Sequence, residues 1–170
     1  MALEQLGYAP LPYYSEPPES PLSTPDVAEE YPLVLTSGAR VSNFFTPEHR
    51  QLPRLRRGHP EPLVELHPDT AATLDIKEGE WIWIESKRGK IRQKTKLTKG
   101  IDPRAINVEF GWWFPERKDG DYGVWESNAN VLTNIEPPYD PAMGTYQLRR
   151  CCAKSTSLSL VNARCNLPFA

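Results

Sequence analysis

The sequence predicts a mainly β domain, a barrel or sandwich of about six short strands with one or two short helices. Two observations support this fold class. Short runs of strand-favouring residues recur along the chain, and they are separated by turn residues such as Gly, Pro, Asp and Ser. In addition, residues 81–97 read as two strand-like runs joined by a short polar turn, which is typical of a β-hairpin.

The chain begins with a Pro-rich, acidic segment, residues 1–30. This composition predicts an extended leader, because proline cannot donate to a helix or a strand ladder. We expect the leader to make few contacts with the core, since burying prolines and carboxylates gains little free energy. Residues 31–36 (YPLVLT) predict the first strand, with a tight turn at Ser37-Gly38, and residues 62–66 predict the second.

Residues 67–74 (HPDTAATL) predict a short helix, because Pro and Asp stand in its first turn, where free amide groups and the helix dipole favour them. Residues 81–85 and 91–97 predict the two arms of the hairpin. In the second arm, one face carries Ile91, Gln93, Thr95 and Leu97, and the other carries Arg92, Lys94 and Lys96. We interpret the three cations as a solvated sheet edge, which lysine commonly protects.

Residues 105–110 and 146–153 predict the remaining strands. The domain boundaries that follow are a leader over residues 1–30, a β domain over 31–154 and a tail over 155–170.

Charge and composition exclude several classes of protein. With a formal net charge of -2, the chain has no sequence-wide basic field, so we expect neither nucleic acid nor a membrane surface as a general partner. No run approaches the roughly 18 apolar residues that a membrane-spanning helix needs. The N-terminus has no secretion signal, and we expect a cytoplasmic location, although an exported protein would carry its signal on a missing N-terminal part.

The chain has 3 cysteines, at positions 151, 152 and 165, and no CxxC pair. This pattern supports neither a disulfide framework nor a zinc site. We expect buried or half-buried thiols.

The order of the sequence pieces carries a resemblance. A strand is followed by TSGAR, then by the HPDTA helix, the KEGEW turn, the SKRGK hairpin, GWW and finally SNANVLT. This order resembles the C-terminal domain of the dimethyl sulfoxide reductase family, over about residues 31–154. The resemblance implies a six-stranded double-psi β-barrel that closes over two molybdopterin guanine dinucleotides, which hold molybdenum or tungsten.

The resemblance assigns cofactor contacts to the end of the first strand. Thr36 and Ser37 offer hydroxyls, Gly38 lets the backbone approach a ligand closely, and Arg40 presents a planar donor fork for phosphate or pterin oxygens. Relatives often carry His at the positions of Asn43 and Phe45, and this sequence departs from that pattern. Asn43 can still donate and accept hydrogen bonds.

Three further candidates come from later segments. Trp112 follows a strand, and because neighbouring strand residues point to opposite faces, only one of the GWW tryptophans can readily meet a ligand. Asn130 matches the family's Asn-x-Leu-Thr element, and Gln147 begins the last predicted strand. If the family interpretation holds, Thr36–Gly38, Arg40 and Asn130 should share one rim of the barrel. The arginine-rich run 47–58 is either a solvated loop or a face toward a substrate funnel or a partner subunit.

The family's metal ligand lies in an earlier domain, so the resemblance implies a cofactor-binding domain with no catalytic residue of its own. The expected partners are the remaining domains of the same enzyme and an iron–sulfur electron-transfer subunit. Two alternatives stay open. One is a separate small barrel subunit that docks onto a catalytic chain, and the other is a double-psi barrel module without any pterin.

Overall fold

The computed structural model describes residues 11, 14, 16–38, 41–135, 139 and 151–157. Their helices and strands follow one another in the order α2 (Pro25–Glu30), β1 (Leu33–Ser37), α3 (Pro53–Arg56), β2 (Leu63–Leu66), α4 (Pro68–Thr73), β3 (Trp81–Ser86), β4 (Gly89–Leu97), β5 (Ala105–Val108), α5 (Val124–Ser127), η1 (Ala129–Val131) and β6 (Cys151–Ser157).

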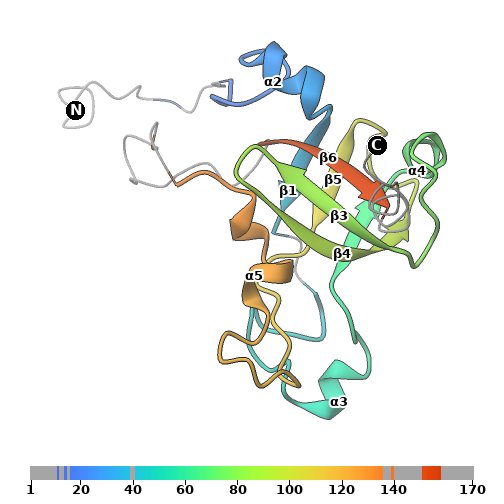
Figure 1. Cartoon of the computed structure of the whole chain (residues 1–170), viewed down its shortest axis with the longest axis vertical. Coiled ribbons are helices and arrows are strands. Elements are labelled where there is room, and N and C mark those ends of the chain that lie inside the picture. The colour runs from blue at the N-terminus through green and yellow to red at the C-terminus, as the bar shows by residue number, and fades with distance from the viewer. Residues whose placement is uncertain are drawn as a thin grey trace, which may run out of the picture.

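The six strands form a closed barrel in the order β1-β5-β2-β4-β3-β6, and β6 pairs with β1 to close it (Figure 1). The β1/β5 and β2/β4 pairs are parallel, and the other four pairs are antiparallel. The predicted mainly β fold with six barrel strands is therefore confirmed. The predicted short helix after the second strand is also confirmed, as α4.

Strand directions define two ends of the barrel. In the register, Ser37 of β1 pairs with Val108 of β5, Val64 of β2 pairs with Val108, and Ser86 of β3 pairs with Gly89 of β4. The ends of β1, β3 and β5 and the starts of β2, β4 and β6 therefore lie at the same end. The loops around α3 and α5 leave from this end and form a lobe beside the barrel (Figure 1). We call this end the lobe end.

Alternating side chains fill the barrel. Along β3, burial alternates strictly between half-buried and buried residues, as a strand with one inward face requires. The buried core of the barrel comprises Leu33, Leu35, Val64, Leu66, Ala71, Ile76, Ile82, Ile84, Ile91, Ile106, Val108, Ala129, Leu132 and Ala153. Ala129 and Leu132 follow α5, so the segment after the lobe returns to the barrel and joins its core.

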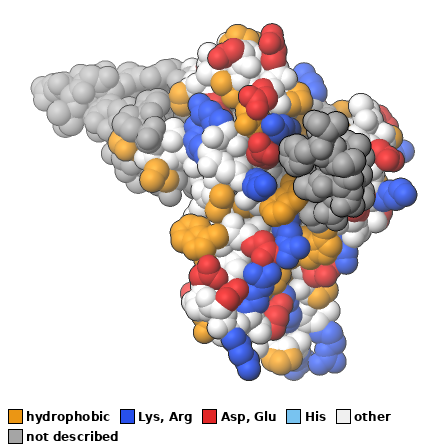
Figure 2. Space-filling view, viewed as in Figure 1, with side chains coloured by type: hydrophobic (Ala, Val, Ile, Leu, Met, Phe, Trp, Pro, Cys, Tyr) orange, Lys and Arg blue, Asp and Glu red, His pale blue; other side chains and the backbone are white. Residues whose placement is uncertain are grey.

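The interpretation of the β4 cations as a solvated edge is wrong. Because the barrel is closed, β4 lies between β2 and β3 and has no free edge. Each cation instead has an acidic partner: Arg92 contacts Glu126, Lys94 lies 2.5 Å from Glu61, and Lys96 lies 2.9 Å from Glu65. On the face in Figure 2, basic and acidic side chains are likewise interspersed.

The lobe has its own small core. Phe44, Trp112 and Phe114 are buried together, and Trp112 is completely inaccessible. The guanidinium carbons of Arg50 and Arg56 lie 4.7 and 4.8 Å from the Trp112 ring, which is cation–π geometry. Burial lowers the pKa of Arg50 to about 10, although the negative charge of Glu109 acts in the opposite direction.

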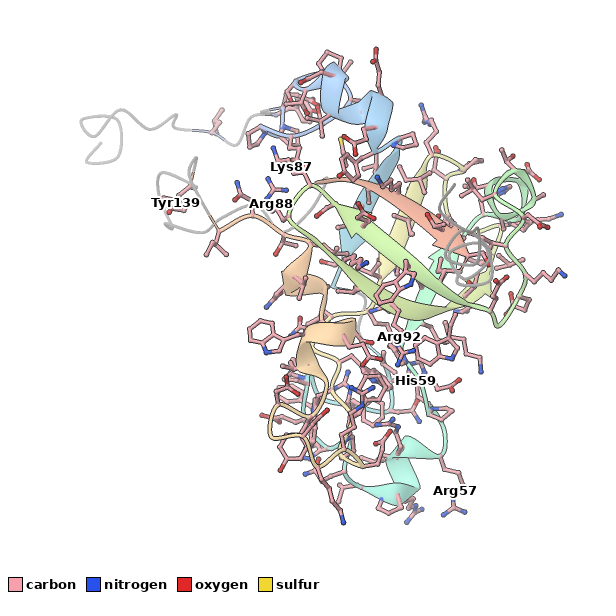
Figure 3. The ribbon with its side chains drawn as sticks, viewed as in Figure 1. Arg57, His59, Lys87, Arg88, Arg92 and Tyr139 are labelled. Atoms are coloured by element: carbon pink, nitrogen blue, oxygen red, sulfur yellow. The ribbon has the colours of Figure 1, made fainter. Side chains whose placement is uncertain are left out.

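The arginines of residues 47–58 therefore divide into two kinds. Arg50 and Arg56 pack against the lobe core, whereas Arg54 and Arg57 are exposed. Arg57 points outward from the far end of the lobe (Figure 3). A wholly solvated loop is the wrong interpretation for this segment, because two of its four cations anchor it.

The expectation of a loosely attached leader is wrong for residues 16–30. The Glu19 carboxylate is only 7% exposed and accepts two hydrogen bonds from Arg88, at 3.1 and 2.6 Å. It also lies 2.9 Å from Lys87 Nζ and accepts a hydrogen bond from the Cys152 amide at 3.3 Å. In Figure 3, Lys87 and Arg88 lie next to the leader. The acidic composition of the leader predicted a solvated segment. Instead, one of its carboxylates, that of Glu19, forms ion pairs with Arg88 and Lys87 and so attaches the leader to the β3–β4 turn.

The last strand is described from Cys151 onward, and residues 146–150 of the predicted strand lie outside the described residues. It runs over Cys151–Ser157, so it continues past the expected boundary at residue 154. Cys152 on this strand is a free, buried thiol, as expected, and burial raises its pKa. Cys165 lies outside the described residues.

Candidate functional site

The end of β1 reaches the lobe end with polar, half-buried residues. Thr36 Oγ1 lies 3.3 Å from the Ile106 carbonyl oxygen and 3.1 Å from Asn107 Oδ1 on the neighbouring strand. Gly38, which is exposed, has φ +95°, a backbone conformation that residues with a Cβ rarely adopt. The chain therefore leaves the barrel through a turn that brings its backbone to the surface without a side chain over it.

Thr36 is the first member of a polar row across four strands, with Asn107, Glu65 and Lys96 on β5, β2 and β4. Asn107 Nδ2 donates to Glu65 Oε2 at 3.0 Å, and Lys96 Nζ donates to Glu65 Oε1 at 2.9 Å. The hydrogen bond from Lys96 lowers the pKa of Glu65, and the same bond raises the pKa of Lys96. Both oxygens of Glu65 are thus satisfied.

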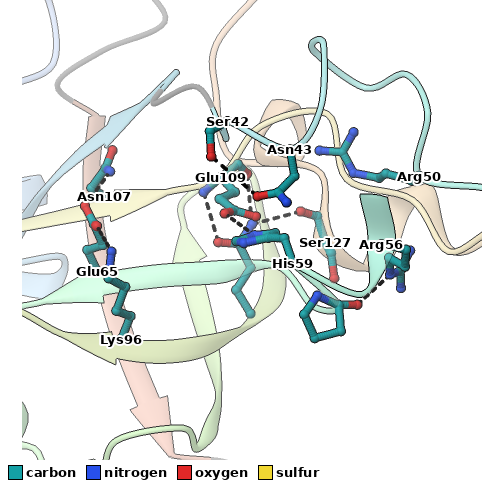
Figure 4. Close-up of polar contacts among 12 residues, drawn as sticks. Ser42, Asn43, Arg50, Arg56, His59, Glu65, Lys96, Asn107, Glu109 and Ser127 are labelled. Atoms are coloured by element: carbon teal, nitrogen blue, oxygen red, sulfur yellow. Dashed lines mark hydrogen bonds and ion pairs between the residues drawn. The ribbon is translucent and has the colours of Figure 1, made fainter. Parts of the chain in front are cut away.

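A polar cavity of about 250 Å³ lies between this row and the lobe. Its lining residues are Val41, Ser42, Asn43, His59, Leu63, Glu65, Lys96, Asn107 and Glu109. Figure 4 labels all of them except Val41 and Leu63. Asn43 is held close to the chain at Gly58, where an added Cβ would lie 2.4 Å from Asn43 Nδ2. The loop after β1 can therefore present the Asn43 amide to the cavity only because position 58 has no side chain.

Glu109, directly after β5, forms the inner wall of the cavity. Its Oε1 lies 2.6 Å from His59 Nε2, and both side chains are largely buried. Gln93, which is fully buried, fixes the backbone of Glu109: its Nε2 donates to the Glu109 carbonyl at 2.9 Å, and its Oε1 accepts from the Glu109 amide at 3.1 Å. Gln93 Nε2 also donates to the Ser127 carbonyl at 3.1 Å, which ties α5 to the same strand.

Asn130 belongs to η1, which packs on the β3–β4 turn. Ser86 Oγ donates to the Leu132 carbonyl at 3.0 Å, and a Cβ on Gly89 would lie 2.8 Å from Val131 Cγ1, so the two segments touch directly. Asn128 Oδ1 accepts from the Asn130 amide at 3.0 Å. Asn128 is thus used in capping the turn, and the exposed Asn130 side chain is the one available at the surface.

The candidates from the sequence are placed as follows. Thr36, Ser37, Gly38, Asn43 and Asn130 all lie at the lobe end, although they come from three separate segments. Trp112 lies in the lobe core with no exposed surface, so its ring packs against the lobe and has no free face for a ligand. Arg40 and Gln147 lie outside the described residues.

Sequence reasoning missed four residues of the cavity wall, His59, Glu65, Asn107 and Glu109, and also missed the role of Gln93, which holds Glu109 in place. One signal was available, because Gln93 occupies an inward position of a strand otherwise lined by Ile, Thr and Leu. A buried amide at such a position must have hydrogen-bond partners, and here these partners form the site.

The part of the chain that the structure describes shows neither a metal site nor a membrane-spanning helix. No group of three or more His, Cys, Asp or Glu side chains is placed to hold a metal ion. No described helix has the length and apolar character needed to span a membrane.

Comparison with known proteins gives consistent matches. A family model described as "Molydopterin dinucleotide binding domain" matches residues 33–153. The chain is 42% identical over 158 residues to dopamine dehydroxylase of Eggerthella lenta, covering 93% of this chain and 15% of that protein. It is 36% identical over 151 residues to acetylene hydratase of Syntrophotalea acetylenica, covering 86% of this chain and 21% of that protein.

Among solved structures, acetylene hydratase from Pelobacter acetylenicus is similar with a TM-score of 0.84 and 35% identity. That similarity covers 91% of this chain and 22% of the other. The chain therefore spans about a fifth or less of the length of these relatives.

Proposed function

Because the chain belongs to the molybdopterin dinucleotide-binding domain family of molybdopterin oxidoreductases, we propose that its lobe end binds a molybdopterin guanine dinucleotide in a larger molybdenum or tungsten enzyme. The observation that carries the proposal is the convergence of the end of β1, the loop at Asn43 and the turn at Asn130 on one end of the barrel.

The residues present fit such a ligand. Gly38 exposes its backbone, and the amides of Asn43 and Asn130 can both donate and accept, as the edges of a heterocycle require. Thr36, Ser37 and Arg40 would add hydroxyls and a cation for phosphate oxygens. In this assignment Arg40 and Gln147 rest on the family resemblance. When bound, the cofactor supplies the redox-active metal, and this chain's residues bind and orient the dinucleotide.

We propose that this domain binds the dinucleotide cofactor and supplies no catalytic residue. The relatives carry this domain as 15–22% of their length, so the metal's protein ligand and the electron-transfer partner are assigned to the rest of the enzyme. The proposed partners of this domain are the remaining domains of the same enzyme and an iron–sulfur subunit. Neither a free-standing barrel subunit nor a pterin-free module has comparable support, because the matched relatives include dopamine dehydroxylase and acetylene hydratase, in which the domain is part of a longer chain.

The test is cofactor occupancy in the full-length enzyme. Arg40→Ala and Asn130→Ala should each lower the metal and the pterin per protein, while the melting curve of the cofactor-free enzyme stays unchanged. A charge-assisted hydrogen bond is worth about 1.5–3 kcal/mol, so Arg40→Ala should weaken binding by roughly 10- to 150-fold. Arg54→Ala is the matched control, since Arg54 is an exposed arginine of the lobe. Unchanged occupancy in both variants would contradict the proposal.

A further inference from the structure

One buried carboxylate oxygen, on a residue that lines the cavity, has no explanation within the fold. Glu109 is 8% exposed, and its Oε2 is buried with no hydrogen-bond partner among the described residues. Its Oε1 is in contact with His59. A buried charged acceptor without a donor is costly, and each such group in a native structure calls for a specific explanation, such as an ordered water or a bound ligand.

Glu109 is also held rigidly in place. Gln93, 0% exposed, binds both the amide and the carbonyl of Glu109, so the residue cannot turn its backbone to find another donor. His59 lies against the carboxylate and limits its rotation (Figure 4). Glu109 is therefore a fixed part of the cavity lining, so a ligand in the cavity would find its carboxylate held in one position.

The charges of the cavity select the kind of ligand. Lys96 is neutralised by Glu65, which leaves Glu109 and His59 as the remaining ionisable pair, so the lining does not favour a phosphate. The described residues also contain no cluster that would hold a metal ion. A neutral ligand group with two adjacent N–H donors would satisfy the Glu109 carboxylate. Asn43 lines the same cavity, and its amide could donate a hydrogen bond to a carbonyl oxygen next to those donors on the ligand.

We propose that Glu109 binds the 2-aminopyrimidin-4-one edge of a ring, and that Asn43 assists it. This edge carries one ring N–H and one amino group side by side, and it occurs in both pterin and guanine. The inference rests on the proposed function, because that cofactor contains both rings. At about 250 Å³, the cavity is smaller than the roughly 300–1,000 Å³ typical of whole-ligand pockets, so it would take one ring and not the dinucleotide.

The first test compares matched small molecules on the wild-type chain by calorimetric or NMR titration. Pterin is compared with lumazine, which has an oxygen in place of the amino group, and GMP is compared with IMP, which lacks that group. At least one amino compound should bind tenfold or more tightly than its partner, because the partner leaves a carboxylate oxygen without a donor. The pair that shows the difference identifies the ring. Equal binding within both pairs, or no binding of any of the four, overturns the proposal.

The second test uses Glu109→Gln, which replaces one carboxylate oxygen by an NH₂ donor of nearly the same size. The preference for the amino compound should fall at least tenfold. Glu126→Gln is the matched control, since Glu126 is a half-buried carboxylate of the lobe that contacts Arg92 and Arg117 and does not line the cavity. It should leave the preference unchanged. If Glu109→Gln keeps the wild-type preference for the amino compound, a group other than Glu109 recognises the 2-aminopyrimidin-4-one edge.

The two proposals fail separately. If Arg40→Ala and Asn130→Ala lower cofactor occupancy but lumazine and IMP bind as well as their partners, only the role of Glu109 is wrong. If those two variants retain the cofactor, the proposed function is wrong, whatever the small molecules show. The comparison of ligands needs no variant, so it stands even if Glu109→Gln does not fold.

Discussion

Gln93→Leu offers the most direct test of how the lobe end is held together. The substitution keeps a side chain of similar size but removes an amide that makes three hydrogen bonds, to the Glu109 amide, the Glu109 carbonyl and the Ser127 carbonyl. Gln93 is 0% exposed, so water cannot readily replace these bonds. Each buried backbone group left without a partner costs about 1–3 kcal/mol.

Three such groups set an upper range of about 3–9 kcal/mol, and the apolar gain from a buried leucine offsets about 1.5–3 kcal/mol. We therefore expect a net loss of about 3 kcal/mol in the free energy of unfolding, which corresponds to roughly 6–12 °C in melting temperature for a chain of this size. Urea unfolding followed by tryptophan fluorescence measures it. Gln51→Leu, at an exposed position, should stay within about 0.5 kcal/mol. A loss below 1 kcal/mol in Gln93→Leu would refute the reasoning.

Two more predictions concern the lobe and the leader. Trp112→Ala should cost about 3–5 kcal/mol, because it empties the lobe core and frees Arg50 and Arg56, whereas Trp125→Ala, at a residue 69% exposed, should cost little in the same urea experiment. For Glu19, burial alone would raise the pKa, but Arg88 and Lys87 outweigh it and lower the pKa below its ordinary value. The stabilisation it provides is therefore present above its unfolded-state pKa of about 4.3 and disappears as the pH falls through the lower, folded-state pKa. Glu19→Gln should destabilise the chain at pH 7 and match the wild type at low pH; a pH-independent difference would exclude the ion pair as its cause.

The barrel strands could be predicted because their signals are local. Alternation in β3 and β4 and the turn residues between them lie within one stretch of sequence, and the structure follows that pattern. The continuation of β6 to Ser157 could not be predicted in this way, since CCAKSTS has little apolar alternation. It becomes a strand by pairing with β1 and β3, which are far away in the sequence. The same cause explains the wrong interpretation of β4: whether a strand has a free edge depends on its distant partners.

The burial of charges was equally beyond local reasoning. Arg50 stands in a polar, Arg-rich stretch of sequence. It is buried because it packs against Trp112, which comes from a later segment of the chain. Glu19 stands among prolines and acids, and only the β3–β4 turn supplies its cations. A lone charged residue carries no sign of its eventual partner, so composition assigns it to solvent by default.

The difference between the predicted barrel and the unpredicted cavity follows from the kinds of contact that build them. Apolar packing is non-directional, so a period of two is enough to place Ile82, Ile84 and Ile91 inside the barrel. The lobe end is instead fixed by directional bonds in which one amide, that of Gln93, serves both β5 and α5. A change that weakens these bonds should therefore disturb Glu109 and the α5 turn together while the apolar barrel persists. Stability of the lobe and the geometry of the candidate site are in this way linked through a single buried side chain.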